Sequence, residues 1–302
     1  MAQQNKQTFA APERAGRLDV FLTEQFENYP RSMVQNLIKQ GAVAVNGKPA
    51  KPATQLEEGD IVEITWPETK KTVDLKKLII ADNKDFFVIN KPAGLLVHPQ
   101  SPAWELNEAA LFTGDETLVA AIVAAKPKGF DLDMPRAGLV HRLDRETSGV
   151  MLIAKNTPFQ EEMQVLFAAR QMHKTYNAIC CGAVPDEEGT IDVPIGRVTG
   201  GKIKASELGR DAITDFKVLE RKKGFTLLEL YPRTGRTNQL RVHMSWLGYP
   251  VLGDWLYKGT DAPRLMLHAR RLEFKHPMTG RQMKFEIDPP KDFLQAWKEK
   301  TK

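Results

Sequence analysis

The sequence predicts an α+β protein in two parts: a small N-terminal domain and a larger domain built on a mixed, mainly antiparallel sheet. In the larger part, strand-like segments outnumber helical ones and do not alternate regularly with them, which argues against a doubly wound fold. The chain has 302 residues, more than the roughly 100–200 residues of a typical domain. Residues 67–77 are polar and contain four lysines and a proline, as linkers do. We expect a flexible leader over residues 1–15, the small domain over 16–66, the larger domain over 78–290 and a C-terminal tail over 291–302.

Composition excludes several protein classes. The net charge of +5 and the isoelectric point of about 9.0 are compatible with a polyanionic partner. Apolar runs are far shorter than the roughly 20 residues of a membrane-spanning helix, and the first residues lack the apolar core of a signal peptide. Cys180 and Cys181 are adjacent, which favours two free thiols over a disulfide or a metal pair. The six histidines lack metal-site spacing. We expect a cytoplasmic monomer without membrane contact.

The small domain combines two short helices with a hairpin. Asn46-Gly47 indicates a tight turn between strands. Arg31, Gln35 and Lys39 fall at i, i+4 and i+8 on the polar face of the second helix. This row either contacts a phosphate backbone or is an ordinary solvated helix face. The apolar patterns predict helices over 17–26 and 33–40 and strands over 42–45 and 61–65.

These residues resemble the alpha-L RNA-binding domain, the type shared with ribosomal protein S-four. The resemblance covers about fifty residues and implies that the small domain binds RNA. The motifs that carry it are Arg17-Leu-Asp, Pro30-Arg-Ser, Gln35–Gly41, Val45-Asn-Gly-Lys48 and Gly59-Asp60. The candidate RNA-binding residues are Arg17, Arg31, Gln35, Lys39 and Lys48.

The larger domain contains a dense functional segment, residues 136–155. Thr157 is expected to cap the helix that follows, because Pro158 occupies its first turn. The patterns predict strands over 86–90, 138–143, 150–154, 175–183, 212–219 and 225–231, and helices over 117–125, 157–170, 237–247 and 292–302.

Asp144 is the candidate catalytic residue. It lies between Arg142 and Arg145, and opposite charges within reach should lower its pKa and keep it ionised. An ionised carboxylate mounted on a loop serves as a nucleophile or a base. The alternative is an ion pair that only holds a turn together.

Arg236 and Tyr176 are the candidate partners of this carboxylate. Arg236 lies at the entry of a predicted helix, and its planar fork suits a carboxylate better than a lysine does. Alternatively, Arg233, Arg236 and Arg241 are phosphate ligands or surface charges. Tyr176 starts a strand, where it either stacks on a flat base and assists proton transfer or is a half-buried strand aromatic.

Together these segments resemble the RluA/RluD family of pseudouridine synthases, and the resemblance spans residues 78–290. The run from His141 to Gly149 matches the family signature nearly letter for letter. Asn238 departs from the pattern, because the family usually has His there. The other matching motifs are Asn90–Gly94, Val97-His-Pro99, Lys174-Thr-Tyr176, Thr234–Met244 and Leu265–Ala269.

The resemblance implies the pseudouridine synthase fold and a set of roles. Asp144 would act on the ribosyl–uracil linkage and Arg236 would pair with it. Tyr176 would stack on the flipped uracil and assist proton removal from its carbon 5. The expected substrate contacts are Arg142, which would fill the space that the base leaves, Leu267, which would line the pocket, and His141 and Arg145. The isomerisation conserves all atoms, so no cofactor and no metal are expected.

The resemblance favours large-subunit ribosomal RNA as the partner, with transfer RNA second. Two other functions stay open from the residues. A non-catalytic RNA-binding assembly factor would not need Asp144, Tyr176 and Arg236 together. A hydrolase of N-glycosidic bonds would need a second carboxylate, for which only Glu146 and Asp133 lie near in sequence.

Overall fold

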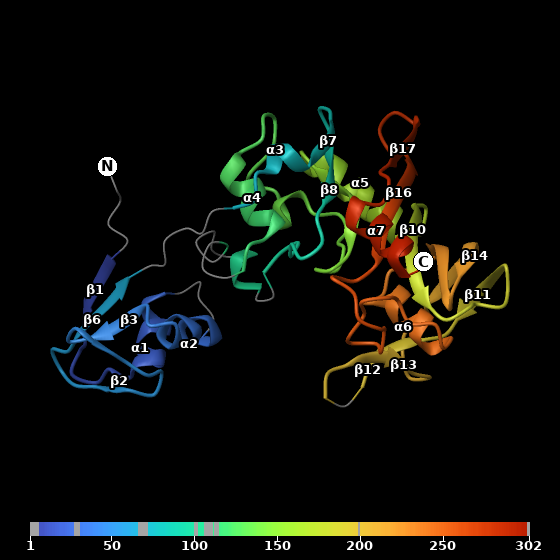
Figure 1. Ribbon diagram of the computed structural model, residues 1–302. Helices are drawn as coiled ribbons and strands as arrows, with labels where there is room; N and C mark the ends of the chain where they lie inside the picture. The colour runs from blue at the N-terminus through green and yellow to red at the C-terminus, as the bar shows by residue number, and fades with distance from the viewer. Residues whose placement is uncertain are drawn as a thin grey trace. The chain divides into compact units, whose positions relative to one another are not determined.

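The computed structural model describes residues 6–26, 31–65, 72–99, 102–105, 111, 115–198 and 200–300 (Figure 1). The chain divides into an N-terminal unit, residues 1–74 with 98–125, and a larger unit, residues 75–97 with 126–302. Residues 98–125, which we assigned to the larger domain, thus cluster with the N-terminal unit. Within the described residues, no helix is long and apolar enough to cross a membrane.

The N-terminal unit packs two helices beside a four-stranded sheet. Asn46 and Gly47 both have positive φ, at 50° and 72°, as a tight hairpin turn requires. The core comes from one apolar face of each helix and from the sheet, with Leu18, Leu22 and Val62 fully buried. The sheet order is β1 (Lys6–Ala10), β6 (Ile61–Thr65), β3 (Val43–Val45), β4 (Lys48–Pro49), and the other elements are β2 (Gly16–Arg17), α1 (Leu18–Gln25), α2 (Arg31–Lys39), β5 (Gln55–Leu56), η1 (Pro102–Glu105) and α4 (Leu118–Ala125).

The expected flexible leader is wrong for residues 6–10. They form β1, which pairs antiparallel with β6 from Lys6 opposite Thr65 to Ala10 opposite Ile61. The ring of Phe9 packs edge-on against that of Phe26 at 5.6 Å. The segment is polar because an edge strand exposes much of its surface, and we read that polarity as absence of structure. Residues 1–5 of the leader, and 66–71 around the predicted linker, lie outside the described residues.

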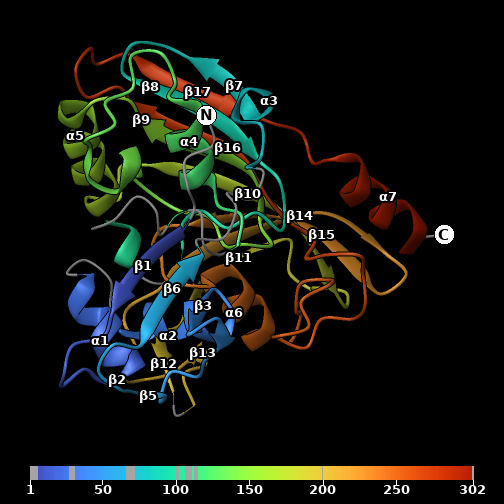
Figure 2. The same ribbon diagram turned by 90° about the vertical axis from the view of Figure 1, so that its left-hand side faces the viewer.

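The larger unit is built on a nine-stranded sheet (Figures 1 and 2). Every pairing in it is antiparallel except that of β16 with β9, so the predicted mixed, mainly antiparallel sheet is confirmed. The order is β11 (Glu188–Asp192), β14 (Ile213–Lys222), β15 (Phe225–Pro232), β10 (His173–Cys181), β16 (Leu267–Lys275), β9 (Ser148–Ala154), β8 (Phe86–Lys91), β7 (Ile79–Asp82), and β17 (Gln282–Glu286) also pairs with β16.

Helices lie at both ends of this sheet. Both views place α6 beside the hairpin of β12 and β13. Figure 2 shows α5 at the other end of the sheet, near β9. Asn156, and not Thr157, caps α5, since its side chain accepts a hydrogen bond from the N–H of Phe159. The remaining elements are α3 (Leu75–Leu78), which takes up the end of the predicted linker, η3 (Pro135–Gly138), α5 (Thr157–Ala168), β12 (Ile195–Arg197), β13 (Ile203–Ala205), α6 (Gln239–Trp246) and α7 (Lys291–Lys300).

Two predicted segments differ from the structure. Residues 138–143 are not a strand: Arg136, Ala137 and Gly138 all have positive φ, and a Cβ on Gly138 would lie 2.2 Å from a backbone oxygen of β9. Backbone in that conformation does not continue as a strand. The helix predicted over 292–302 is confirmed as α7, but the segment is not a separate tail, because Phe293 and Trp297 pack against a buried cluster of Ile179, Leu252 and Met266 in the larger unit.

Candidate active site

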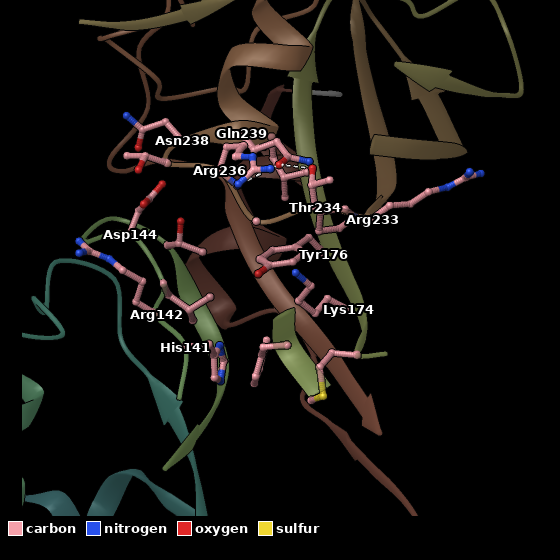
Figure 3. Close-up of a pocket in the computed structure, with 18 of the residues that line it drawn as sticks. His141, Arg142, Asp144, Lys174, Tyr176, Arg233, Thr234, Arg236, Asn238 and Gln239 are labelled. Atoms are coloured by element: carbon pink, nitrogen blue, oxygen red, sulfur yellow. Dashed lines mark hydrogen bonds between the residues drawn. The ribbon is translucent and has the colours of Figure 1, made fainter. Parts of the chain in front are cut away.

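A pocket of about 500 Å³ opens in the larger unit (Figure 3). Asp144 and Arg142 come from the loop before β9, while Tyr176 and Lys174 come from β10. Figure 3 shows these two groups on opposite sides of the hollow, with Arg236 and Asn238 at one end. Among the residues that the structure describes, the lining contains a single carboxylate, Asp144, and six basic side chains: Arg142, Arg170, Lys174, Arg233, Arg236 and Arg241.

Lys91 fixes the loop that carries Asp144 by hydrogen bonds to backbone carbonyls. We did not predict this role for Lys91 from the sequence. The Lys91 side chain is fully buried, and its ammonium donates to the carbonyl oxygens of Pro92, Leu95 and Arg145 at 2.7–3.0 Å. Burial lowers its pKa to about 7. The N–H of Thr147 donates to the carbonyl of Asp144 and closes a turn at 3.1 Å. These bonds join the 91–95 segment to the turn and hold the carboxylate at the pocket.

The charge of Asp144 is less stabilised than its two arginine neighbours in sequence suggest. Burial raises the pKa of its carboxyl group, and Arg241, Arg142 and Lys91 oppose that rise. Our prediction of a lowered pKa is therefore wrong, because neighbours along the chain do not direct both guanidinium groups onto the carboxylate. Arg145 instead donates through Nε to the carbonyl of Gly94 at 3.1 Å.

The ion pair of Asp144 is made with Arg241 and not with Arg236. Nη1 of Arg241 lies 3.9 Å from Oδ2 of Asp144. Arg236 lines the same pocket, but its Nε donates to the carbonyl of Asp211 at 3.0 Å. The reason is the start of α6 at Gln239, two residues later than predicted, which leaves Arg236 on a loop and puts Arg241 in the first turn. Arg241 belongs to the motif that we identified, but spacing alone did not distinguish it from Arg236.

Gln239 shapes the loop that carries Arg236. Its Oε1 accepts hydrogen bonds from the hydroxyl of Thr234 at 2.6 Å and from the N–H of Arg236 at 3.0 Å. Its Nε2 donates to the carbonyl of Ile213 and the hydroxyl of Thr214. This buried amide thus uses both of its polar atoms to hold the pocket wall.

Tyr176 lines the pocket, and its predicted role as a stacking ring stays a prediction. Figure 3 shows its ring facing the hollow with the hydroxyl toward the Asp144 side. Burial, together with the charge of Asp144, raises the pKa of the phenol. The hydroxyl therefore stays protonated at neutral pH, which favours stacking or hydrogen-bond donation over proton removal by a phenolate.

The other predicted substrate contacts divide into two groups. Arg142, Leu267 and His141 line the pocket, whereas Arg145 is not among the described lining residues. His141 is neutral: burial lowers its pKa to about 3, and its Nε2 accepts the N–H of Leu152 at 2.9 Å. Its contacts therefore attach the loop to β9. Lys174, which belongs to the motif Lys174-Thr-Tyr176, also lies in the pocket, and burial lowers its pKa to about 8.

In the N-terminal unit, three of the five candidate RNA-binding residues converge on Asp19. This carboxylate is fully buried and accepts hydrogen bonds from Arg17 and Arg31 at 3.0–3.2 Å and from Gln35 at 2.6 Å. The arginine side chains stay about half exposed, at 42% and 48%. Asp19 thus holds these cations in place while part of each faces solvent. The other two candidates, Lys39 and Lys48, are exposed on the same unit.

Comparison with known proteins identifies the family of this fold and site. The model of the RNA pseudouridylate synthase family matches residues 85–246, and that of the S4 domain matches residues 16–62. The chain belongs to the RNA pseudouridylate synthase family. The synthase is 36% identical to an uncharacterized RNA pseudouridine synthase, YlyB, of Bacillus subtilis, over 95% of each chain. It is 35% identical to the ribosomal large subunit pseudouridine synthase D of Pseudomonas aeruginosa, over 92% of this chain and 90% of that one.

A solved structure agrees with this assignment. Human RNA pseudouridylate synthase domain containing 4 superposes with a TM-score of 0.58 at 29% identity, over 74% of the synthase and 93% of the human chain. The predicted pseudouridine synthase fold, the enzyme class and the RNA-binding N-terminal domain are therefore confirmed. Among the described residues, no group of three or more His, Cys, Asp or Glu side chains is arranged to hold a metal ion.

Proposed function

We propose that this synthase isomerises uridines of large-subunit ribosomal RNA to pseudouridine, with Asp144 as its essential carboxylate. One observation carries the proposal: in the described part of the lining, Asp144 is the only acid, and it shares the pocket with six basic side chains and the ring of Tyr176. Such a pocket suits a polyanionic nucleic acid and still supplies one group able to act on a sugar.

The chemistry requires that the target nucleotide leave the RNA stack. Flipping a base costs a few kcal/mol, and stacking on an aromatic ring returns roughly 1–3 kcal/mol. We assign that stacking to Tyr176, and to Arg142 the space that the base leaves. Asp144 then acts on the bond between the anomeric carbon and the ring nitrogen, and the detached uracil rotates and rejoins through carbon 5. Carbon 5 gives up its proton to solvent as the new bond forms, and the freed ring nitrogen takes up a proton in exchange. The composition is unchanged and nothing is oxidised, so the reaction requires no cofactor.

The lining disfavours hydrolysis of an N-glycosidic bond. Classical glycosidases place two carboxylates about the scissile bond, and the described lining offers only Asp144. Glu146, the nearer alternative in sequence, lies on the turn and pairs with Arg145 at 3.6 Å. Asp133 is not among the described lining residues either.

The choice of ribosomal RNA rests on relatives and on the N-terminal unit. Several similar proteins carry the name ribosomal large subunit pseudouridine synthase D. Arg17, Arg31 and Gln35, arranged around Asp19, with Lys39 and Lys48, would bind phosphates and position the RNA. Transfer RNA is the alternative substrate. We further propose that the synthase acts as a monomer in the cytoplasm.

The test combines an activity assay with a map of the modified sites. Tritium release from RNA labelled at carbon 5 of uridine should follow incubation with the synthase. Mapping pseudouridines across total RNA, with and without the protein, should locate sites in large-subunit ribosomal RNA. Sites only in transfer RNA would select the alternative substrate, and no release from any RNA would refute the isomerase.

A further inference from the structure

Arg241 lies between two carboxylates and engages them unequally. Its Nε donates to Oδ2 of Asp254 at 2.7 Å, and its Nη2 donates to Oδ1 of the same residue at 2.9 Å. Its third nitrogen, Nη1, lies 3.9 Å from Oδ2 of Asp144. The side chain of Asp254 is fully buried, whereas that of Asp144 is 26% exposed. Asp254 therefore engages Nε and Nη2 of Arg241, and only Nη1 is left to face Asp144.

Asn238 and Tyr257 complete the surroundings of the guanidinium. Nη1 of Arg241 donates to Oδ1 of Asn238 at 3.1 Å, and Nδ2 of Asn238 donates to the hydroxyl of Tyr257 at 3.1 Å. The guanidinium carbon lies 5.1 Å from the centroid of the Tyr257 ring. Asn238 has φ 54°, a left-handed conformation that asparagine tolerates better than most residues. The residue that departs from the family pattern therefore keeps polar contacts in this chain.

The loop that carries Asp254 is built tightly. The carbonyl of Asp254 accepts the N–H of Gly259 at 2.8 Å, and its Oδ1 accepts the N–H of Tyr257 at 3.2 Å. A Cβ at Gly253 would lie 1.9 Å from the carbonyl oxygen of Arg264, and a Cβ at Gly259 would lie 2.0 Å from that of Val251. Only glycine fits at both positions, so the backbone of the loop packs closely on its neighbours, while the hydrogen bonds from Arg241 and Tyr257 orient the carboxylate of Asp254.

We propose that Asp254 is a positioning residue that fixes the orientation of Arg241 and takes up two of its three guanidinium nitrogens, so that Asp144 is held through one nitrogen only. The inference rests on the proposed role of Asp144. When an arginine binds a carboxylate through two nitrogens, both carboxylate oxygens accept a hydrogen bond from the guanidinium group. Asp254 prevents that two-nitrogen contact and leaves the oxygens of Asp144 available to the sugar.

The proposal makes a signed prediction about pH. The charged groups that act on Asp144 are Arg241 from α6, Arg142 from its own loop, Lys91 from β8 and Asp254 from the 253–259 loop. The three cations lower the pKa of Asp144, and Asp254 raises it. Neutralising Asp254 removes a raising charge and frees Arg241 to turn onto Asp144. The pKa of Asp144 should then fall, and with it the basicity of the carboxylate.

The decisive variant is Asp254→Asn, which keeps the shape of the side chain and removes its charge. In single-turnover tritium release, we expect the maximal rate to fall by about 100-fold, with the Kd for RNA within about threefold. When the maximal rate is plotted against pH, the fall in rate on the acid side, the acid limb, should move to lower pH by about one unit. The control is Asp292→Asn, which breaks another two-pronged arginine pair, with Arg264, in the same unit. It should keep the wild-type rate and profile.

A second variant covers the case in which Asp254→Asn fails to fold. Asn238→Gly suits the left-handed backbone and removes the acceptor that draws Nη1 of Arg241 away from Asp144. It should shift the acid limb in the same direction by a smaller amount. An unshifted limb in every folded variant would overturn the proposal, because a purely structural salt bridge alters stability without altering that profile. An inactive wild type would instead refute the proposed function.

Discussion

The tripeptide Arg-Leu-Asp occurs in both units, and the two copies have opposite electrostatics. In the N-terminal unit, Arg17 turns back onto Asp19 through two hydrogen bonds of 3.0 Å, and the pKa of that carboxyl group is strongly lowered. In the larger unit, Asp144 meets its ion-pair partner at 3.9 Å, and burial raises its pKa. The middle residue, Leu18 or Leu143, is buried in both.

The difference lies in what surrounds each copy. Asp19 lies in the first turn of α1, and α2 brings Arg31 and Gln35 to the same carboxylate. Asp144 lies on a turn over Lys91, and its partner is already engaged by Asp254. A carboxylate whose oxygens are all hydrogen-bonded serves as a structural element, as Asp19 does. A carboxylate with free acceptor positions is able to act on a substrate, which is the role that we propose for Asp144. The tertiary environment, and not the tripeptide, decides between the two.

The largest expected effect comes from removing the negative charge of Asp144. Asp144→Asn should abolish tritium release, with at least about a 1000-fold loss of rate, and leave RNA affinity nearly unchanged. Glu146→Gln is the control and should stay active, because Glu146 lies on the same turn but is not among the described lining residues. An active Asp144→Asn enzyme would show that Asp144, like Asp19, is not required for the chemistry.

The next effect separates the two arginines of the pocket. Arg241→Lys should lower the maximal rate by about 100-fold, since a lysine cannot hold Asp254 with two nitrogens and still meet Asp144 with a third. Arg236→Lys should cost about tenfold or less, because Arg236 contacts a backbone carbonyl and not the carboxylate. Both rates are read from single-turnover assays at saturating enzyme. The reverse ranking would restore Arg236 as the partner.

Local pattern predicted the positions of the main helices and strands, while the contacts within the site depended on tertiary structure. The helices 17–26 and 237–247 were found to within two residues, because apolar spacing reports which face is buried. The strand β1 was missed, since polar edge strands look like loops. Asp254 gave no signal: a single aspartate between Gly253 and Trp255 becomes informative only when the fold brings it to Arg241. The pKa of Asp144 was predicted in the wrong direction for the same reason.

A smaller effect on activity should follow from replacing Asp19, the aspartate of the Arg-Leu-Asp tripeptide in the N-terminal unit. Asp19→Asn leaves two guanidinium groups with a weaker acceptor, and hydrogen bonds to a charged group contribute roughly 1.5–3 kcal/mol. We expect faster amide exchange in α1 and α2 and weaker RNA binding, with the maximal rate at saturating RNA nearly unchanged. Glu24→Gln, exposed on the same helix, is the control. A large loss of maximal rate would show that the two copies are not separate in function.

The smallest effect is a difference in pH response between the two copies. In the proposed mechanism Asp144 acts as an ionised carboxylate, and its pKa is raised. Activity should therefore fall as the pH drops through a value above the ordinary one of about 3.9. Asp19 has a lowered pKa. Its contribution to stability is therefore present above the ordinary value and is lost only as the pH falls toward the folded pKa. On acidification, tritium release should decline reversibly while amide protection in α1 and α2 persists. Simultaneous loss of both would mean that acid unfolding, and not protonation of Asp144, sets the profile.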